Sequence, residues 1–159
     1  MRKKTICLLT GAAVLTLALS GCAGFPGFGP QITDIKSFRF SYQVGNYMNG
    51  SVAYELKLEK DGSYTARIKP NQVAEEDAKE HKVGKDFADE LAAFLREKKV
   101  NRWNGFQKSD KRVLDGNGFS FSLWTTEDRN ISASGYMRWP RGYDEVKAGI
   151  EAIFAKLGK

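Results

Sequence analysis

Histidine and cysteine are scarce in this chain of 159 residues, which holds one histidine and two cysteines. The histidine, His81, lies in the charged stretch of residues 77–82, a setting typical of an ordinary surface side chain. A nucleophilic triad needs a base held beside a serine or cysteine, and the motif G-x-S-x-G is missing. A zinc site uses mostly His and Cys ligands. We therefore expect neither a catalytic histidine nor a bound metal.

Loops that cradle phosphates are missing as well. No glycine-rich phosphate loop or dinucleotide fingerprint occurs, so the sequence predicts no nucleotide cofactor. The stretch Asp115-Gly116-Asn117 begins like a calcium loop. Phe119 stands where the third oxygen ligand of such a loop should be, and the match fails there. No cofactor is therefore expected.

A strong charge of one sign is also missing. Without residues 1–21, which hold three basic and no acidic residues, the chain has 22 basic and 19 acidic residues, a formal charge of +3. Nucleic-acid-binding domains carry a much larger basic excess, so we expect no nucleic-acid partner. A charge of +3 suits a mixed solvated surface with mild attraction to anionic lipid or cell-wall polymers.

No hydrophobic run is long enough to cross a membrane. Residues 6–19 form the longest mainly apolar run, 14 residues, and a spanning helix needs about 20. Arg2, Lys3 and Lys4 precede the run, and small residues follow it as Ser20-Gly21-Cys22-Ala23. A positive segment, a short apolar segment and a small-residue cleavage site together predict a secretory signal peptide.

The four residues that end this signal, Leu19-Ser20-Gly21-Cys22, resemble the lipobox of bacterial lipoproteins. The resemblance implies that Cys22 receives a diacylglyceryl group, that cleavage occurs before it, and that the new amine takes a fatty acyl chain such as palmitate. Two or more chains hold a protein stably on a membrane. The other cysteine, Cys7, leaves with the signal, so no disulfide is expected in the mature chain.

The sequence thus divides into three parts. Residues 1–21 are the predicted signal peptide, residues 22–31 the lipidated cysteine with a Gly/Pro-rich tether, and residues 32–159 one domain. Phe25 and Phe28 in the tether have two open alternatives: they enter the lipid interface or pack on the domain. The expected location is the cell membrane or the outer membrane, with the domain outside the cytoplasm.

Alternation of apolar and polar residues predicts five strands in the domain. Their ranges are 35–44, 52–59, 64–69, 119–125 and 130–138. Residues 71–82 are polar and fit either a loop or an extension of the helix that follows. Residues 100–118 show no period and are expected to be irregular.

Two amphipathic helices complete the predicted domain. The first starts near Val83, with Asp86 as its expected N-cap, and carries Phe87, Leu91, Phe94 and Leu95 on one stripe. The stripe of the second helix holds Tyr143, Val146, Ile150, Ile153, Phe154 and Leu157. The expected fold is α+β in the order βββ-α-ββ-α: an antiparallel five-stranded sheet with both helices on one face.

Aromatic residues are the main functional signal in the second half of the domain. If Phe119, Phe121 and Leu123 face the helices, then Ser120, Ser122 and Trp124 face the other way. Tyr136 falls on this opposite face too, so we predict a binding face of Trp124, Tyr136, Ser120 and Ser122. Three further aromatics, which we expect to close the ends of the core, are Trp103, Phe106 and Trp139.

One carboxylate is a candidate acid or base. Asp115 stands near many aromatics, although an Asp-Gly pair is most often a simple turn. Trp103-Asn104-Gly105-Phe106, Asp115-Gly116 and Trp139-Pro140 together resemble segments of small uncharacterised bacterial lipoproteins. That resemblance implies one structural unit and no activity.

Three hypotheses follow from the sequence. The first is a non-catalytic module of the cell envelope that binds an envelope protein or a cell-wall glycan. The second is an inhibitor or accessory subunit of an exported enzyme. The third is an acid/base hydrolase that uses Asp115, for which a second carboxylate in a cleft is required.

Overall fold

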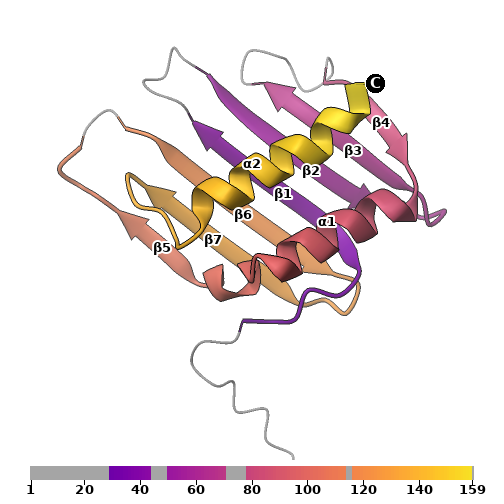
Figure 1. The fold of residues 1–159 in the computed structure, drawn as a ribbon, viewed down its shortest axis with the longest axis horizontal. Helices are drawn as coiled ribbons and strands as arrows, with labels where there is room; N and C mark the ends of the chain where they lie inside the picture. Colours follow the sequence, from indigo (N-terminus) through magenta and orange to yellow (C-terminus); the bar gives the residue numbers. More distant parts are fainter. Residues whose placement is uncertain (1–28, 44–49, 71–77, 114–115, 159) are drawn as a thin grey trace, which may run out of the picture.

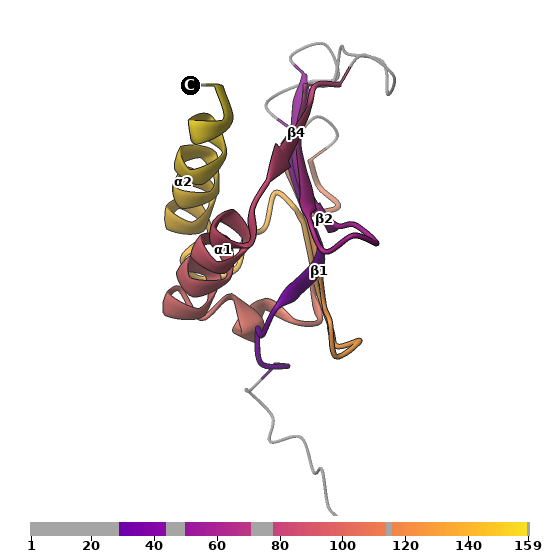
Figure 2. The ribbon, with the colours of Figure 1, turned by 90° about the vertical axis from the view of Figure 1, so that its right-hand side faces the viewer.

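The computed structural model describes residues 29–43, 50–70, 78–113 and 116–158. In this part of the chain, a seven-stranded sheet carries two helices on one side (Figures 1 and 2). The strands are β1 (Ile35–Gln43), β2 (Ser51–Leu58), β3 (Tyr64–Pro70), β4 (Glu80–Val83), β5 (Phe106–Ser109), β6 (Gly118–Thr125) and β7 (Asn130–Tyr136). The helices are α1 (Lys85–Glu97) and α2 (Tyr143–Phe154), with the 3-10 turns η2 (Val100–Trp103) and η3 (Ala155–Gly158).

The expected antiparallel five-stranded sheet is wrong. The strand order is β4-β3-β2-β1-β6-β7-β5, and β5 runs parallel to β7, so the sheet is mixed. The two unexpected strands, β4 and β5, have four residues each and lie at the two edges. An edge strand with little burial needs no apolar alternation, and periodicity therefore cannot detect it. The α+β class is confirmed.

The start of α1 also differs from the expectation. Residues 80–83 form β4, so the stretch 71–82 does not extend the helix, and its residues 71–77 lie outside the described part. Gly84 is the N-cap of α1 and makes no side-chain cap hydrogen bond, whereas Asp86 lies in the first turn. The carboxylate of Asp86 is still favourably placed, because the helix dipole presents positive charge at that end.

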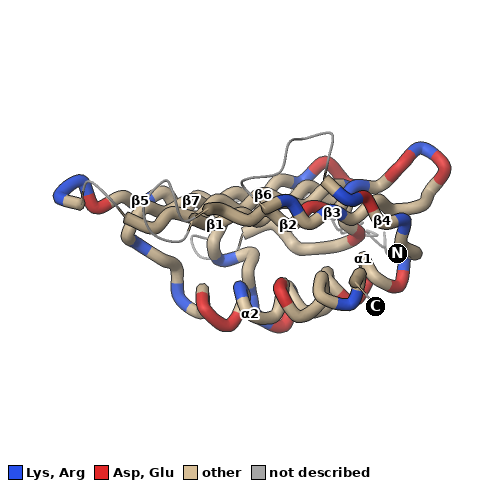
Figure 3. The backbone as a smooth tube through the Cα atoms, turned by 90° about the horizontal axis from the view of Figure 1, so that it is seen from above, with Lys and Arg blue, Asp and Glu red and all other residues tan. Residues whose placement is uncertain are grey.

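Both helices cover the same face of the sheet (Figure 3). A dense aromatic core lies between the two layers. Phe121 of β6 is 1% exposed and meets Phe38 edge-on, at 5.7 Å between ring centroids. Phe154 of α2 packs edge-on against Tyr54 of β2 and Phe87 of α1. The predicted inward positions of the strands and helices are thus the ones that build this core.

A polar cluster attaches α2 to the centre of the sheet. The hydroxyl of Tyr42 on β1 donates a hydrogen bond to Glu151 of α2. Lys147 of the same helix lies over the Tyr42 ring, 4.2 Å from its centroid, and 3.7 Å from the Glu151 carboxylate. Burial and the hydrogen bond to Glu151 both raise the pKa of Tyr42, and burial raises that of Tyr143.

These tyrosines should make the domain sensitive to alkali. Their folded pKa lies above the unfolded value of about 10, so the unfolded chain is the first to lose the phenolic proton. Stability is therefore full below pH ~10 and falls as the pH rises above it. Tyrosinate absorbance followed beside circular dichroism should show Tyr42 and Tyr143 ionising only with unfolding. Ionisation of all six tyrosines in a folded chain would contradict this prediction. The control is Tyr42→Phe, which should remove one of the tyrosines that ionise only with unfolding.

Candidate functional site

The face of the sheet away from the helices, here called the outer face, carries the residues predicted to bind. Phe119, Phe121 and Leu123 are buried, and Trp124 is 43% exposed on the opposite side of β6. Ser120 is exposed and Ser122 half-buried on that same side, and Tyr136 of β7 is half-buried. The predicted register of β6 therefore describes the side chains correctly.

The two aromatic residues of the outer face do not form one strip. Trp124 pairs with Asn130, and Tyr136 pairs with Gly118, at the two ends of the β6–β7 ladder. The two rungs are six positions apart along β7, a distance of about 20 Å at roughly 3.3 Å per residue. The rungs between them hold the serine pairs Ser120–Ser134 and Ser122–Ser132. The structure thus leaves two separate rings with a flat hydroxyl surface between them.

A ladder of charges crosses the other half of the outer face. Arg39, Glu55, Arg67 and Glu80 lie opposite one another on β1, β2, β3 and β4. Arg39 pairs with Glu55, whose carboxylate is 3.8 Å from Arg67, and Arg67 is 3.0 Å from Glu80. The four charges cancel. Ion pairs of this kind contribute about 0–1 kcal/mol each, and we assign them to strand register rather than to ligand binding.

Two predicted site residues cannot be placed. Cys22 and Asp115 both lie outside the described residues. His81 lies on β4, opposite Ala66 at the edge of the sheet. Among the described residues, no group of three or more His, Cys, Asp or Glu side chains is close enough to hold a metal ion. No helix in the same part of the chain has both the length and the apolar character to cross a membrane.

A hollow of about 880 Å³ is lined by residues from the end of α1, from η2 and β5, and from the start of α2 with the segment before it. We call it the Trp139 groove. Its aromatic lining consists of Trp103, Phe106 and Trp139. Its charged lining consists of Glu97, Lys98, Lys99, Arg102, Lys108, Arg141 and Glu145.

The aromatic residues of the groove differ in their roles. Trp103 is 3% exposed, its Nε1 donates to the Arg141 carbonyl at 3.1 Å, and its ring stacks on Tyr143. Phe106 packs against the core ring of Phe119. Trp139 is 41% exposed and rests on Tyr143, with 6.2 Å between ring centroids. Trp103 and Phe106 therefore form the floor of the groove, and Trp139 is the ring that a ligand can reach.

The charge of the groove is strongly positive. Five cations and two carboxylates line it, a formal charge of +3. One carboxylate, Glu145, lies 3.4 Å from Lys98, and the ammonium of Lys108 lies 5.5 Å from the centre of the Phe106 ring. Residues 22–159 together also carry a formal charge of +3, so their basic excess equals that of this one hollow.

A smaller hollow of about 540 Å³ adjoins the groove and shares Phe106, Lys108 and Trp139 with it. Arg138 lines this second hollow and lies 3.0 Å from the Asp110 carboxylate. Hydrogen bonds from Arg112 and the charge of Arg138 lower the pKa of Asp110 to about 2. Trp139 therefore stands between two hollows, with cations on either side.

The sequence pointed to Trp103, Phe106 and Trp139 but not to the cations around them. Lys99, Arg102 and Lys108 are near in sequence to two of these aromatics, and Arg141 follows the third. Single basic residues scattered through a polar chain resemble an ordinary solvated surface. A sequence signal that could have found this site is the occurrence of tryptophan beside basic residues in two segments, around Trp103 and around Trp139, about 30 residues apart.

Comparison with known proteins gives no match: no protein-family model fits the chain, and no curated protein is significantly similar to it in sequence. The geometry and charge of the described residues are therefore the features that indicate function. Among them, the Trp139 groove combines a concave shape, an accessible ring and an excess of cations.

Proposed function

We propose that the protein is a lipid-anchored lipoprotein of the cell envelope whose domain binds, without catalysis, an acidic cell-wall polymer in the Trp139 groove. The anchor part is supported by the signal-like segment and by Leu19-Ser20-Gly21-Cys22. A domain held outside the cytoplasm on a membrane meets polymers with carboxylate or phosphate groups. The groove suits such a ligand in both shape and charge.

The observation that carries the proposal is the exposed Trp139 ring inside a hollow lined by five cations. A tryptophan face packs on the apolar face of a sugar ring and adds contact area at little entropic cost. Arginine and lysine bind carboxylate and phosphate groups through charge-assisted hydrogen bonds. Together, these side chains select a ligand that presents both sugar rings and anionic groups.

Binding without catalysis is supported by the state of the groove's carboxylates. Glu97 and Glu145 have side chains that are 73% and 72% exposed. A general acid of the glycosidase type needs an apolar pocket around its carboxyl group. The two carboxylates are therefore better suited to balancing the nearby lysines than to proton transfer.

The anchor has its own test. Cys22→Ser should abolish lipidation and leave an uncleaved or mislocalised precursor, because the modified group is the cysteine sulfur. Intact-mass measurement of the protein in the membrane fraction decides the point. An unmodified Cys22 in that fraction would contradict the proposed anchor. It would not bear on the proposed binding in the Trp139 groove.

The groove is tested by titrating the mature chain with an oligogalacturonate, a poly(glycerol phosphate) and a neutral maltooligosaccharide. We expect binding to an acidic probe that weakens with salt, and little binding to the neutral one. Trp139→Ala should weaken binding by about 1–3 kcal/mol, roughly the loss of one stacked ring. Lys108→Gln with Arg141→Gln should reduce both the affinity and its salt dependence.

The matched control for the groove is Trp124→Ala, which removes a tryptophan of nearly equal exposure from the outer face. It should leave binding unchanged.

A partner protein bound at Trp124 is the second candidate function, favoured by the 43% exposure of that ring. Loss of partner capture with Trp124→Ala but not with Trp139→Ala would support this second candidate over the groove.

A further inference from the structure

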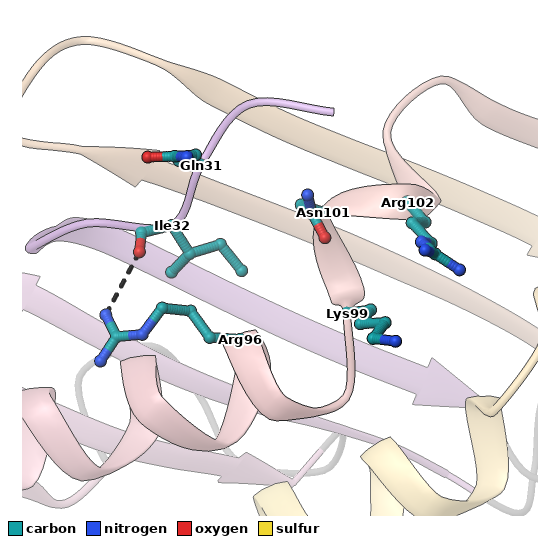
Figure 4. A pocket seen from close by; sticks show the side chains of 6 residues that line it. All are labelled: Gln31, Ile32, Arg96, Lys99, Asn101 and Arg102. Carbon is teal, nitrogen blue, oxygen red and sulfur yellow. Dashed lines mark hydrogen bonds between the residues drawn. The ribbon is translucent and has the colours of Figure 1, made fainter. Parts of the chain in front are cut away.

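The N-terminal segment leaves the folded domain at a defined place beside η2. The side-chain amide of Asn101 donates to the Gly29 carbonyl at 3.4 Å. Arg96 donates to the Ile32 carbonyl at 3.2 Å, the bond drawn in Figure 4. Ile32 is 4% exposed. A side chain at Gly29 would place its Cβ 1.8 Å from the Asn101 carbonyl oxygen, so glycine is required for this close approach.

The distance from this exit to the lipid anchor is short. Gly29 stands seven positions after Cys22 in the chain. A fully extended chain spans at most about 3.6 Å per residue, so an anchor at Cys22 holds the exit within about 25 Å of the lipid on that residue. Whatever surface surrounds the exit is therefore held close to the membrane.

The surface around the exit is basic. A hollow of about 520 Å³ there is lined by Gln31, Ile32, Arg96, Lys99, Asn101 and Arg102, three cations without an acidic residue (Figure 4). The amide of Arg102 donates to the Lys99 carbonyl at 3.0 Å, as in a 3-10 turn. The side chains of Lys99 and Arg102 extend to the same side of this turn in Figure 4. We call Arg96, Lys99 and Arg102 the exit patch; Lys99 and Arg102 also line the Trp139 groove, so the two sites adjoin.

We propose that the exit patch binds anionic phospholipid headgroups and thereby orients the domain with η2 towards the membrane. This inference rests on the anchor of the proposed function, which supplies the proximity. Each basic residue near an anionic bilayer surface strengthens attachment about fivefold, and the attraction fades within a Debye length of about 8–10 Å. None of the residues that line this hollow is acidic.

The experiment uses the chain from Cys22 onward with Cys22→Ser, so that no anchor contributes. Sedimentation with vesicles containing about one third phosphatidylglycerol is compared with sedimentation with pure phosphatidylcholine vesicles. We expect binding to the anionic vesicles that falls with added salt. Lys99→Gln with Arg102→Gln should weaken it about 25-fold, and the charge-conserving pair Lys99→Arg with Arg102→Lys should restore it.

The matched control is Lys57→Gln with Lys60→Gln, which removes two charges in and just after β2. Lys57 lies two strands from Lys82, which stands three residues before α1. The η2 turn follows the other end of α1, about 20 Å away along its 13 residues. The control should change vesicle binding less than twofold. An equal loss in both variants, equal binding to neutral vesicles, or release by inorganic phosphate at constant ionic strength would each overturn the inference.

Failure of the anchor and failure of the exit patch are separately visible. An unmodified Cys22 in cells would contradict the anchor, although the isolated chain could still bind anionic vesicles through Lys99 and Arg102. A lipidated Cys22 with no patch-dependent vesicle binding would keep the anchor and contradict the orientation. In the second case, the domain would rotate freely on its tether.

Discussion

Phe121→Ala should lower the free energy of unfolding by about 3–5 kcal/mol, the usual cost of removing a buried phenylalanine. Phe121 is 1% exposed and contacts Phe38 and Trp103 edge-on, at 5.7 Å in both cases. Its loss removes apolar burial and leaves a cavity between the sheet and the helices. Because three other rings, those of Phe38, Phe40 and Trp103, contact this one, the surrounding side chains have little freedom to collapse into the space.

The control for this variant is its neighbour on the other face, three positions along the same strand. Trp124 is 43% exposed, and Trp124→Ala should cost about 1 kcal/mol or less. Paired urea denaturation curves measure both values. Equal, large losses of unfolding free energy in the two variants would mean that Trp124 is a core residue. That result would contradict the second candidate function.

Trp103→Ala should be similarly damaging, at about 3–5 kcal/mol. Its ring contacts Phe119, Phe121 and Tyr143, which join the sheet to α2. Its Nε1 also holds the Arg141 carbonyl at 3.1 Å, so the residue fixes the segment that carries Trp139. Trp103→Phe keeps much of the ring burial and should cost less, since it mainly loses one hydrogen bond of about 1 kcal/mol and some volume.

The two Trp103 variants separate stability from binding. Trp103→Phe should remain folded at room temperature but bind an acidic probe more weakly, because Arg141 loses its fixed position. Thermal unfolding and the same titration, made on one preparation, measure the two effects. Full stability in Trp103→Ala would show that the ring is not part of the core and would contradict the assigned floor of the groove.

Local patterns account for the parts of the fold that were predicted correctly. In β6, the alternation of Phe119, Phe121 and Leu123 with polar residues reflects burial of one face only. The stripe of Phe87, Leu91 and Leu95 in α1 reflects the same cause at the helical period. Such patterns follow from each element's own geometry and need no knowledge of its neighbours.

The errors lie where neighbours decide the structure. Residues 80–83 and 106–109 carry no apolar alternation, and they are strands because β3 and β7 offer them unpaired edges. The parallel direction of β5 follows from the path of the chain through α1 and η2, which returns it beside β7. The prediction of five strands was wrong because pairing at the edge of a sheet does not require a periodic pattern of hydrophobic residues.

The sequence by itself determined the signal-like segment, the helical stripes and the faces of the main strands, because these depend on the spacing of residues close together in the chain. Only the tertiary structure decided the rest. It placed Trp124 and Tyr136 at opposite ends of a ladder, and it brought Trp139 to the cations that follow α1. The physical reason is that both arrangements depend on which strand lies beside which, and strand order is set by packing of the whole domain.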